Sequence, residues 1–259
     1  MNEIIQLNII QLGIAYVFTV IVFFILSSRK IPQQKLLFIA TIRMSIQLVL
    51  VGYVLIYLFD QQNPWYTVLV LFIMQVFSVY TVLSKFKKKL SLDLKRVVMI
   101  AFPLSTIGVL LFFLFGVVGI SPWYDAQYFI PLAGMIVGNA LTGVSLALSQ
   151  MNQQMHEKQA QVEEVLILGG TLNEATKAIV DQSFSEAIVP TLNTMVGMGI
   201  VFLPGMMTGQ ILSGVSPLLA IRYQIAIMLG ILGSVSLSVF FVLYFGIKTY
   251  FNDQIQIKK

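Results

Sequence analysis

The chain has 259 residues, of which 58% are hydrophobic and only 10% are charged, and its formal net charge is +5. A soluble domain carries about 25% charged residues, so this composition excludes a water-soluble globular protein and predicts a multi-pass membrane protein. The absence of Cys and the single His, His156, exclude disulfides, zinc–thiolate sites and multi-histidine metal centres.

Seven stretches are long and apolar enough to cross a membrane as helices, which need about 20 residues each. Their apolar runs are continuous rather than alternating, which favours helices over strands. The first run lacks the basic n-region of a signal peptide, so we expect it to be retained as a span. We therefore predict an all-α integral membrane protein with a single transmembrane domain over residues 1–259. The expected spans are approximately 6–26, 36–59, 65–83, 97–118, 128–149, 191–212 and 223–247.

The basic residues predict how these spans are oriented. All of the 16 Lys and Arg residues except Arg43 and Arg222 lie in four segments at one predicted membrane side, namely 29–35, 85–96, 158–177 and 248–259. Because basic loops stay in the cytoplasm, we expect an outer N-terminus and a cytoplasmic C-terminus. Trp65 and Trp123 fall at predicted outer ends, where amphipathic rings favour the headgroup region. The distribution of the basic residues is therefore explained by the orientation of the spans in the membrane, and we expect no nucleic-acid partner.

One long cytoplasmic segment, residues 150–189, interrupts the apolar pattern between the fifth and sixth spans. An apolar spacing of three to four residues predicts a helix with Val162, Val165, Leu166 and Leu168 on one face. Gly169 and Gly170 are typical of a helix C-terminus, and Thr171 with Glu174 fits the capping box of a new helix. This helical hairpin either packs on its own bundle or binds another chain.

The spacing within this segment resembles the cytoplasmic EAA loop of ABC importer permeases. Glu163, Glu164 and Val165 stand at the E-A-A places, and Gly169 and Ile179 fall at the Gly and Ile places. Val165 departs from the second Ala, and the Leu-Pro expected after Ile179 is absent. The resemblance implies two short helices that dock into a groove on an ATPase subunit, with Gly170, Thr171 and Glu174 at their junction.

The region 131–228 is similar to the FetB (YbbM) family, the membrane subunits of bacterial iron-exporting ABC transporters. The strings that carry the likeness are VGNALT (137–142), LGGT (168–171), LPGMMTGQIL (203–212) and RYQ (222–224), together with Asn193. The resemblance implies an iron-exporting permease in a bacterial plasma membrane. It also implies a separate ATPase chain as partner, and we expect two permease chains to form a homodimer.

Polar or helix-breaking residues within the spans are candidates for a transport path. Pro204 removes a backbone hydrogen bond and Gly205 loosens the chain beside it, while Asn139 and Thr142 lie one helical turn apart. Arg43 is the one ionisable side chain inside a predicted span, and such a charge suggests function. Helix packing, Met flexibility and snorkelling of Arg43 are the alternative explanations. The full candidate set is Arg43, Gln47, Asn139, Thr142, Asn193, Pro204, Gly205, Met206, Met207, Thr208 and Gln210.

The sequence contains no G-x-x-x-x-G-K-[ST] string. We therefore expect no nucleotide or other cofactor to bind this chain, and ATP to be hydrolysed by the partner. One His and no acid pair within a span leave too few groups for catalysis, so an enzyme is not expected. The alternatives are a secondary transporter or channel without a partner, and an ABC permease for another substrate; the metal ligands are not identifiable from the sequence.

Overall fold

The computed structural model describes residues 7–61, 63–86, 90–252, 254 and 256–257. Every regular element in this described part is a helix, which confirms the predicted all-α class. The chain divides into two compact units, Met1–Gln62 and Asn63–Lys259, and each is described by itself. Both units contain helices of membrane-spanning length and composition, so the chain is a multi-pass membrane protein.

The first unit contains α1 (Ile9–Ala15), α2 (Val17–Ser28) and α3 (Gln34–Gln61). Tyr16 separates α1 from α2, and together these two helices are as long and apolar as one span. The Tyr16 hydroxyl is hydrogen-bonded to Ser45 Oγ of α3 at 2.5 Å. No side chain of α1 or α2 is buried, so their apolar surface is available to lipid or to other helices.

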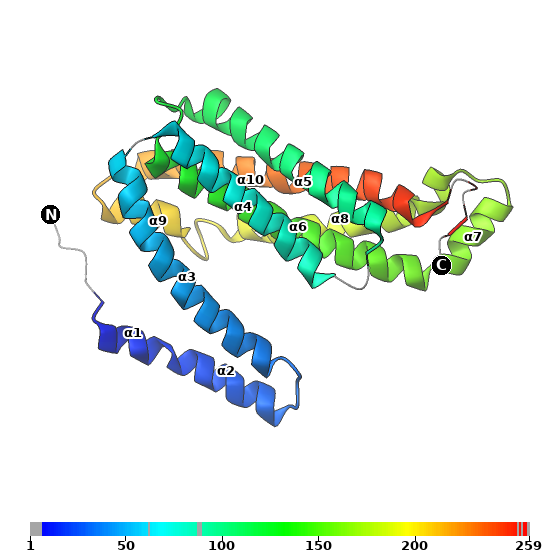
Figure 1. Ribbon diagram of the computed structural model, residues 1–259, viewed down its shortest axis with the longest axis horizontal. Helices are drawn as coiled ribbons and strands as arrows, with labels where there is room; N and C mark the ends of the chain where they lie inside the picture. The colour runs from blue at the N-terminus through cyan, green and yellow to red at the C-terminus, as the bar shows by residue number, and fades with distance from the viewer. Residues whose placement is uncertain (1–6, 62, 87–89, 253, 255, 258–259) are drawn as a thin grey trace. The chain divides into compact units, whose positions relative to one another are not determined.

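The second unit is a bundle in which α4, α5, α6, α8 and α10 run side by side, with α7 near one end and α9 near the other (Figure 1). Its elements are α4 (Pro64–Lys85), α5 (Leu92–Phe112), the π-helix η1 (Phe113–Val118), α6 (Ala126–Glu157), α7 (Gln159–Ile167), α8 (Leu172–Gly197), α9 (Gly205–Leu212), α10 (Pro217–Gly246) and the 3-10 helix η2 (Ile247–Tyr250).

Local sequence explains where these helices begin. The Asn63 side chain accepts a hydrogen bond from Trp65 N at 3.0 Å, and Pro64 follows at the first helical position. Ser91 and Asp125 cap α5 and α6 in the same way, through Leu94 N and Gln127 N. Small polar caps and an early Pro satisfy or remove the amide groups that a helix N-terminus leaves without partners.

The core of the second unit lies where α6 crosses α10 and α8. Gly143 of α6 allows this close approach, because a Cβ there would lie 2.7 Å from Val235 Cγ1 and 3.4 Å from Val239 Cγ2 of α10. Its neighbour Val144 and both of these valines are fully buried. Small residues at such crossings let helix backbones pack closely in membranes.

We therefore expect Gly143→Ala to destabilise the bundle by about 1–3 kcal/mol, the usual cost of overpacking a tight core. The measurement is the thermal unfolding temperature of the purified protein in detergent. Gly134→Ala on the same helix is the matched control, since its Cβ would meet only Met74 Cε at 3.8 Å. Equal unfolding temperatures for the two variants would contradict the close crossing.

The predicted sixth span, 191–212, is not one helix. Its first part is the end of α8, residues Met198–Pro204 are not helical, and its last part is α9. Gly199 adopts φ +84, and its N–H donates to the Phe202 carbonyl at 3.0 Å, so the chain turns there. Pro204 therefore precedes α9 as its N-cap rather than kinking a continuous helix. Six helices among the described residues, not seven, are long and apolar enough to span.

The segment predicted to be cytoplasmic, 150–189, is helical at both ends, and its place relative to the membrane stays a prediction. α6 continues to Glu157, two turns beyond the predicted end of its span, and α8 runs without interruption through Val189. Polar residues on both helices lowered the hydropathy there, although the helices still pack on the bundle. α8 thus joins the turn after α7 directly to the break at Met198.

Charge separates along the second unit as the sequence predicts. Lys85, Lys95 and Lys248 lie at the helix ends that share one side of the bundle with α7, whereas Asp125 and Arg222 lie at the opposite helix ends. Lys87, Lys88, Lys89, Lys258, Lys259 and Glu3 lie outside the described residues. The outer N-terminus, the cytoplasmic C-terminus and the number of crossings stay predictions.

Candidate functional site

The turn between α7 and α8 has the geometry that its two glycines predict. Gly169 adopts φ +89, its N–H donates to Leu166 O at 3.1 Å, and the Gly170 N–H donates to Val165 O at 2.9 Å. This pair of bonds is the Schellman motif that ends many helices. Gly170 is required for a different reason, since a Cβ there would lie 2.6 Å from Val165 Cγ1.

The predicted capping box at the start of α8 is present. The Glu174 carboxylate accepts from the Thr171 N–H at 2.8 Å, and the Glu174 N–H donates to Thr171 Oγ1 at 3.3 Å. The hydrogen bond from the Thr171 backbone, followed by that from its hydroxyl, lowers the pKa of Glu174 below its usual value. The carboxylate therefore supports the cap above its unfolded pKa, and this support is lost as the pH falls through the lowered pKa.

Two large apolar side chains lie exposed at the tip of this turn. Ile167 is 84% exposed and Leu168 is 80% exposed. The apolar spacing predicted Leu168 within the helix, on one face with Val162, Val165 and Leu166, but α7 ends at Ile167 and Leu168 is its C-cap. The carboxylates of Glu163 and Glu164 are exposed on the same short helix. The tip is therefore an apolar pair with acidic residues one turn away.

The helices behind the tip are held firmly in the bundle. Val162 of α7 and Ile179 of α8 are each 1% exposed. Lys158 Nζ donates to Gln154 Oε1 at 3.1 Å and to Gln182 Oε1 at 3.2 Å, which links α6 to α8. Ile179, predicted as part of the coupling loop, thus anchors α8 and is not open to a partner.

The exposed face of α6 is polar or small where a lipid-facing helix would be apolar. Gly138, Asn139 and Thr142 are exposed, and the Asn139 and Thr142 side chains bond to their own helix carbonyls, Met135 O at 2.8 Å and Gly138 O at 3.2 Å. No large hydrophobic residue of α6 beyond Tyr128 is exposed in the described structure. A polar amide facing hydrocarbon is costly, so this face is suited to water, substrate or another protein surface.

The break before α9 places irregular backbone in the segment that the sequence predicts to lie in the membrane. Ile200 is 91% exposed within it. Non-helical backbone at membrane depth occurs where protein or a water-filled cavity covers it. On α9 the Thr208 hydroxyl donates to Pro204 O at 3.0 Å, and Gln210 Oε1 is buried with no hydrogen-bond partner. The irregular backbone and the unpartnered Gln210 oxygen favour a polar environment or a covering chain here.

The remaining path candidates are spread over the chain. Met207 is buried and Met206 is half-buried on α9, Gly205 is exposed at its first position, and Asn193 is exposed on α8. Arg43 and Gln47 share an exposed face of α3, in the first unit, where they border a shallow apolar hollow with Phe38 and Ile42. The structure therefore groups Asn139 with Thr142, and Arg43 with Gln47, in separate units.

Among the described residues, no group of three or more His, Asp and Glu side chains could hold a metal ion. The exposed face of α6 and the segment around α9 offer amide, hydroxyl, carbonyl and thioether groups instead. Amide and carbonyl oxygens suit hard cations, whereas thioethers suit soft ones. The donors alone do not select one metal.

The Uncharacterised protein family (UPF0014) matches residues 9–251 of the chain. The chain belongs to this family. Two relatives match over 91% and 93% of their own lengths, and no solved structure matches the chain.

Three relatives illustrate what the chain is similar to. The "UPF0014 membrane protein YjkA" of Bacillus subtilis is 31% identical, covering 90% of this chain and 91% of the relative. The "Probable iron export permease protein FetB" of Escherichia coli is 30% identical, and the match covers 95% of this chain and 93% of the relative. The "Protein ALUMINUM SENSITIVE 3" of Arabidopsis thaliana is 30% identical, and the match covers 83% of this chain and 77% of the relative. The predicted likeness to FetB is thereby confirmed.

Proposed function

We propose that this protein is the permease subunit of an ABC transporter that exports a metal cation, with iron as the first candidate. The exposed Ile167–Leu168 pair at the tip of the α7–α8 turn is the observation that carries the proposal. A soluble loop gains nothing by exposing two large aliphatic side chains, whereas burial in a partner's groove would stabilise a complex by about 1.5–3 kcal/mol for each.

The partner in this proposal is a cytoplasmic ATPase chain that binds the tip and hydrolyses ATP. Closure of the ATPases would push the α7–α8 turn. Because Ile179, Ser183 and Ala187 bury one face of α8 in the bundle, the push would move α8 together with its neighbours. The displacement would reach the break at Met198 and change access to the polar face of α6, which is alternating access between two bundle states.

We further propose that two permease chains form a homodimer with their α6 faces turned inward. This arrangement would enclose Asn139 and Thr142 in a path between the chains and keep them from lipid. Iron is taken from the name of the FetB relative, and a second relative is named for aluminium sensitivity. Fe³⁺ and Al³⁺ are hard ions that accept oxygen ligands, which the α6 face offers. A bacterial plasma membrane is the proposed location.

Inverted membrane vesicles test this function. The chain would be co-expressed with a candidate ABC ATPase chain, and accumulation of Fe²⁺, Fe³⁺ or Al³⁺ would be measured with and without ATP. We expect accumulation of one of these ions that requires both ATP and the ATPase chain. Accumulation that needs neither would instead support a secondary transporter or channel.

A further inference from the structure

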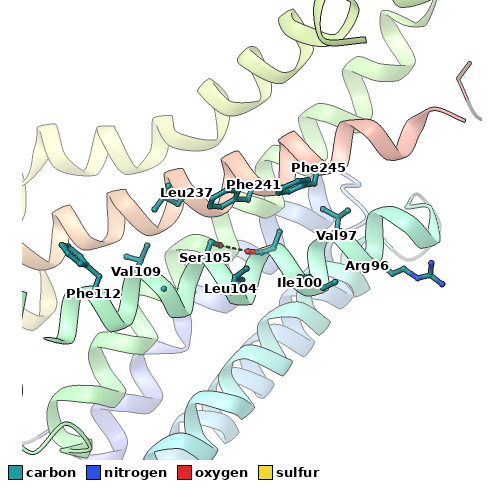
Figure 2. A pocket seen from close by; sticks show the side chains of 12 residues that line it. Arg96, Val97, Ile100, Leu104, Ser105, Val109, Phe112, Leu237, Phe241 and Phe245 are labelled. Atoms are coloured by element: carbon teal, nitrogen blue, oxygen red, sulfur yellow. Dashed lines mark hydrogen bonds between the residues drawn. The ribbon is translucent and has the colours of Figure 1, made fainter. Parts of the chain in front are cut away.

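A long apolar groove runs between α5 and α10 on the outer surface of the second unit. Its larger part has a volume of about 790 Å³ and lies between Val97 and Phe112 of α5 and the facing side of α10 (Figure 2). A second hollow of about 570 Å³ shares Val109, Phe112 and Leu237 with the first. The two parts therefore form one continuous groove along both helices.

Small residues make the floor of this groove and large ones make its walls. Ala101, Ser105 and Gly108 of α5 lie at the floor, and Ser105 Oγ lies 2.8 Å from Ser238 Oγ of α10, so its hydroxyl is satisfied. Phe241 and Phe245 stack along the α10 wall with ring centroids 6.4 Å apart. A Cβ on Gly108 would meet no atom within 4 Å, which shows that space at the floor is open.

An arginine stands at each end of the groove. Arg96 borders the end at the start of α5 (Figure 2). Arg222 borders the end at the start of α10. From Arg222 to Phe245 the α10 axis measures roughly 35 Å at 1.5 Å per residue, slightly more than the hydrocarbon thickness of about 30 Å. The groove is thus long enough to span the membrane core, and this placement would bring a guanidinium near each headgroup layer.

We propose that this groove binds an anionic phospholipid, with an acyl chain along the α5–α10 floor and the phosphate held by Arg96. The guanidinium presents five N–H donors that match phosphate oxygens. Its exposed pairing with Asp93 at 3.8 Å uses only part of them and is worth little at the surface. Arg96 belongs to the basic side of the chain, and the cytoplasmic leaflet carries anionic lipid.

Charge favours lipid over a helix of the first unit as the occupant. At the same predicted membrane side, the helices of the first unit end beside Arg29, Lys30 and Lys35. A first-unit helix of this chain or of a second copy would therefore bring further positive charge next to Arg96. A phospholipid brings an apolar chain and a negative phosphate together, which matches both the groove and its end.

Lipid retention tests the proposal independently of transport. The protein would be purified from nanodiscs of phosphatidylcholine with one-fifth phosphatidylglycerol, and the bound lipids would be counted by native mass spectrometry. We expect the ratio of phosphatidylglycerol to phosphatidylcholine bound to the wild type to exceed the bulk ratio about tenfold, since one charge-assisted hydrogen-bonded contact changes affinity by about that factor. Arg96→Gln should remove this enrichment, and Gly108→Leu, which fills the floor, should lower all retained lipid.

Two controls make the same changes outside the groove. Arg29→Gln removes an exposed arginine from the first unit, and Gly52→Leu adds a side chain where α3 offers open space. Both should retain lipid as the wild type does. The proposal would be overturned if the wild type retained phosphatidylglycerol in the same proportion as the nanodisc bilayer contains it. A second result would also overturn it. If Gly108→Leu leaves the retained lipid unchanged but converts dimers into monomers, as measured by light scattering, a second copy of the chain is the occupant.

Discussion

Replacing Ile167 and Leu168 together by Asp is expected to abolish ATP-driven transport while leaving the chain inserted and folded. The two side chains are 84% and 80% exposed, so the bundle itself loses no packing. A partner groove would lose two buried aliphatic groups, worth about 3–6 kcal/mol together, and would gain two charges. ATPase binding should therefore weaken at least hundredfold, measured by co-purification and by ATP-dependent ion accumulation in inverted vesicles.

The control for this prediction places the same charges on the same helix. Ala160→Asp with Gln161→Asp adds two carboxylates to exposed positions in the first turn of α7, where the helix dipole tolerates them. This variant should bind the ATPase and transport normally. If the tip variant also transports normally, the α7–α8 turn is only a structural hairpin and the coupling hypothesis is wrong.

Replacing Asn139 and Thr142 by Leu is expected to lower transport at least tenfold without lowering the unfolding temperature. Both side chains are exposed and bond only to their own helix in the described structure. Leu in place of both would remove polar groups from a path that carries a cation. If this face instead meets lipid, Leu is the better residue there, and transport should be unchanged or improved.

Two further variants separate a path from a packing role. Asn139→Gln with Thr142→Ser keeps the polar groups and should retain most transport. Thr81→Leu removes a comparable hydroxyl from α4, where Thr81 Oγ1 donates to Phe77 O at 2.8 Å, and should leave transport unchanged. Ion accumulation in vesicles and thermal unfolding in detergent provide the two readouts. Equal loss in all three variants would mean that the bundle is merely sensitive to substitution.

Local signals in the sequence predicted the local structure well. Gly169 and Gly170 ended α7, and Thr171 with Glu174 started α8, because a positive φ and a capping box depend on a few adjacent residues. The Ser91 and Asp125 caps follow the same rule. Hydropathy likewise located the apolar helices, since a helix in lipid must satisfy its backbone within one segment.

Hydropathy did not show how far helices continue beyond the predicted spans. α6 and α8 extend into the segment 150–189, where Gln154, Thr176 and Ser183 are buried against neighbouring helices. A window average cannot distinguish a polar residue in a helix contact from one in a loop. The break at Gly199 was hidden for the opposite reason, because the residues around it are apolar and continue the pattern of a span.

The sequence by itself determined that this is a helical membrane protein of the UPF0014 family, where its helices cap, and on which side its basic charge collects. These properties depend on composition and on contacts between near neighbours. Only the tertiary structure decided that Ile167 and Leu168 lie exposed at the tip, that Ile179 is buried, and that the outer face of α6 lacks large apolar side chains. Exposure depends on which helix faces cover one another, and this is set by close crossings such as that at Gly143, between residues far apart in the chain.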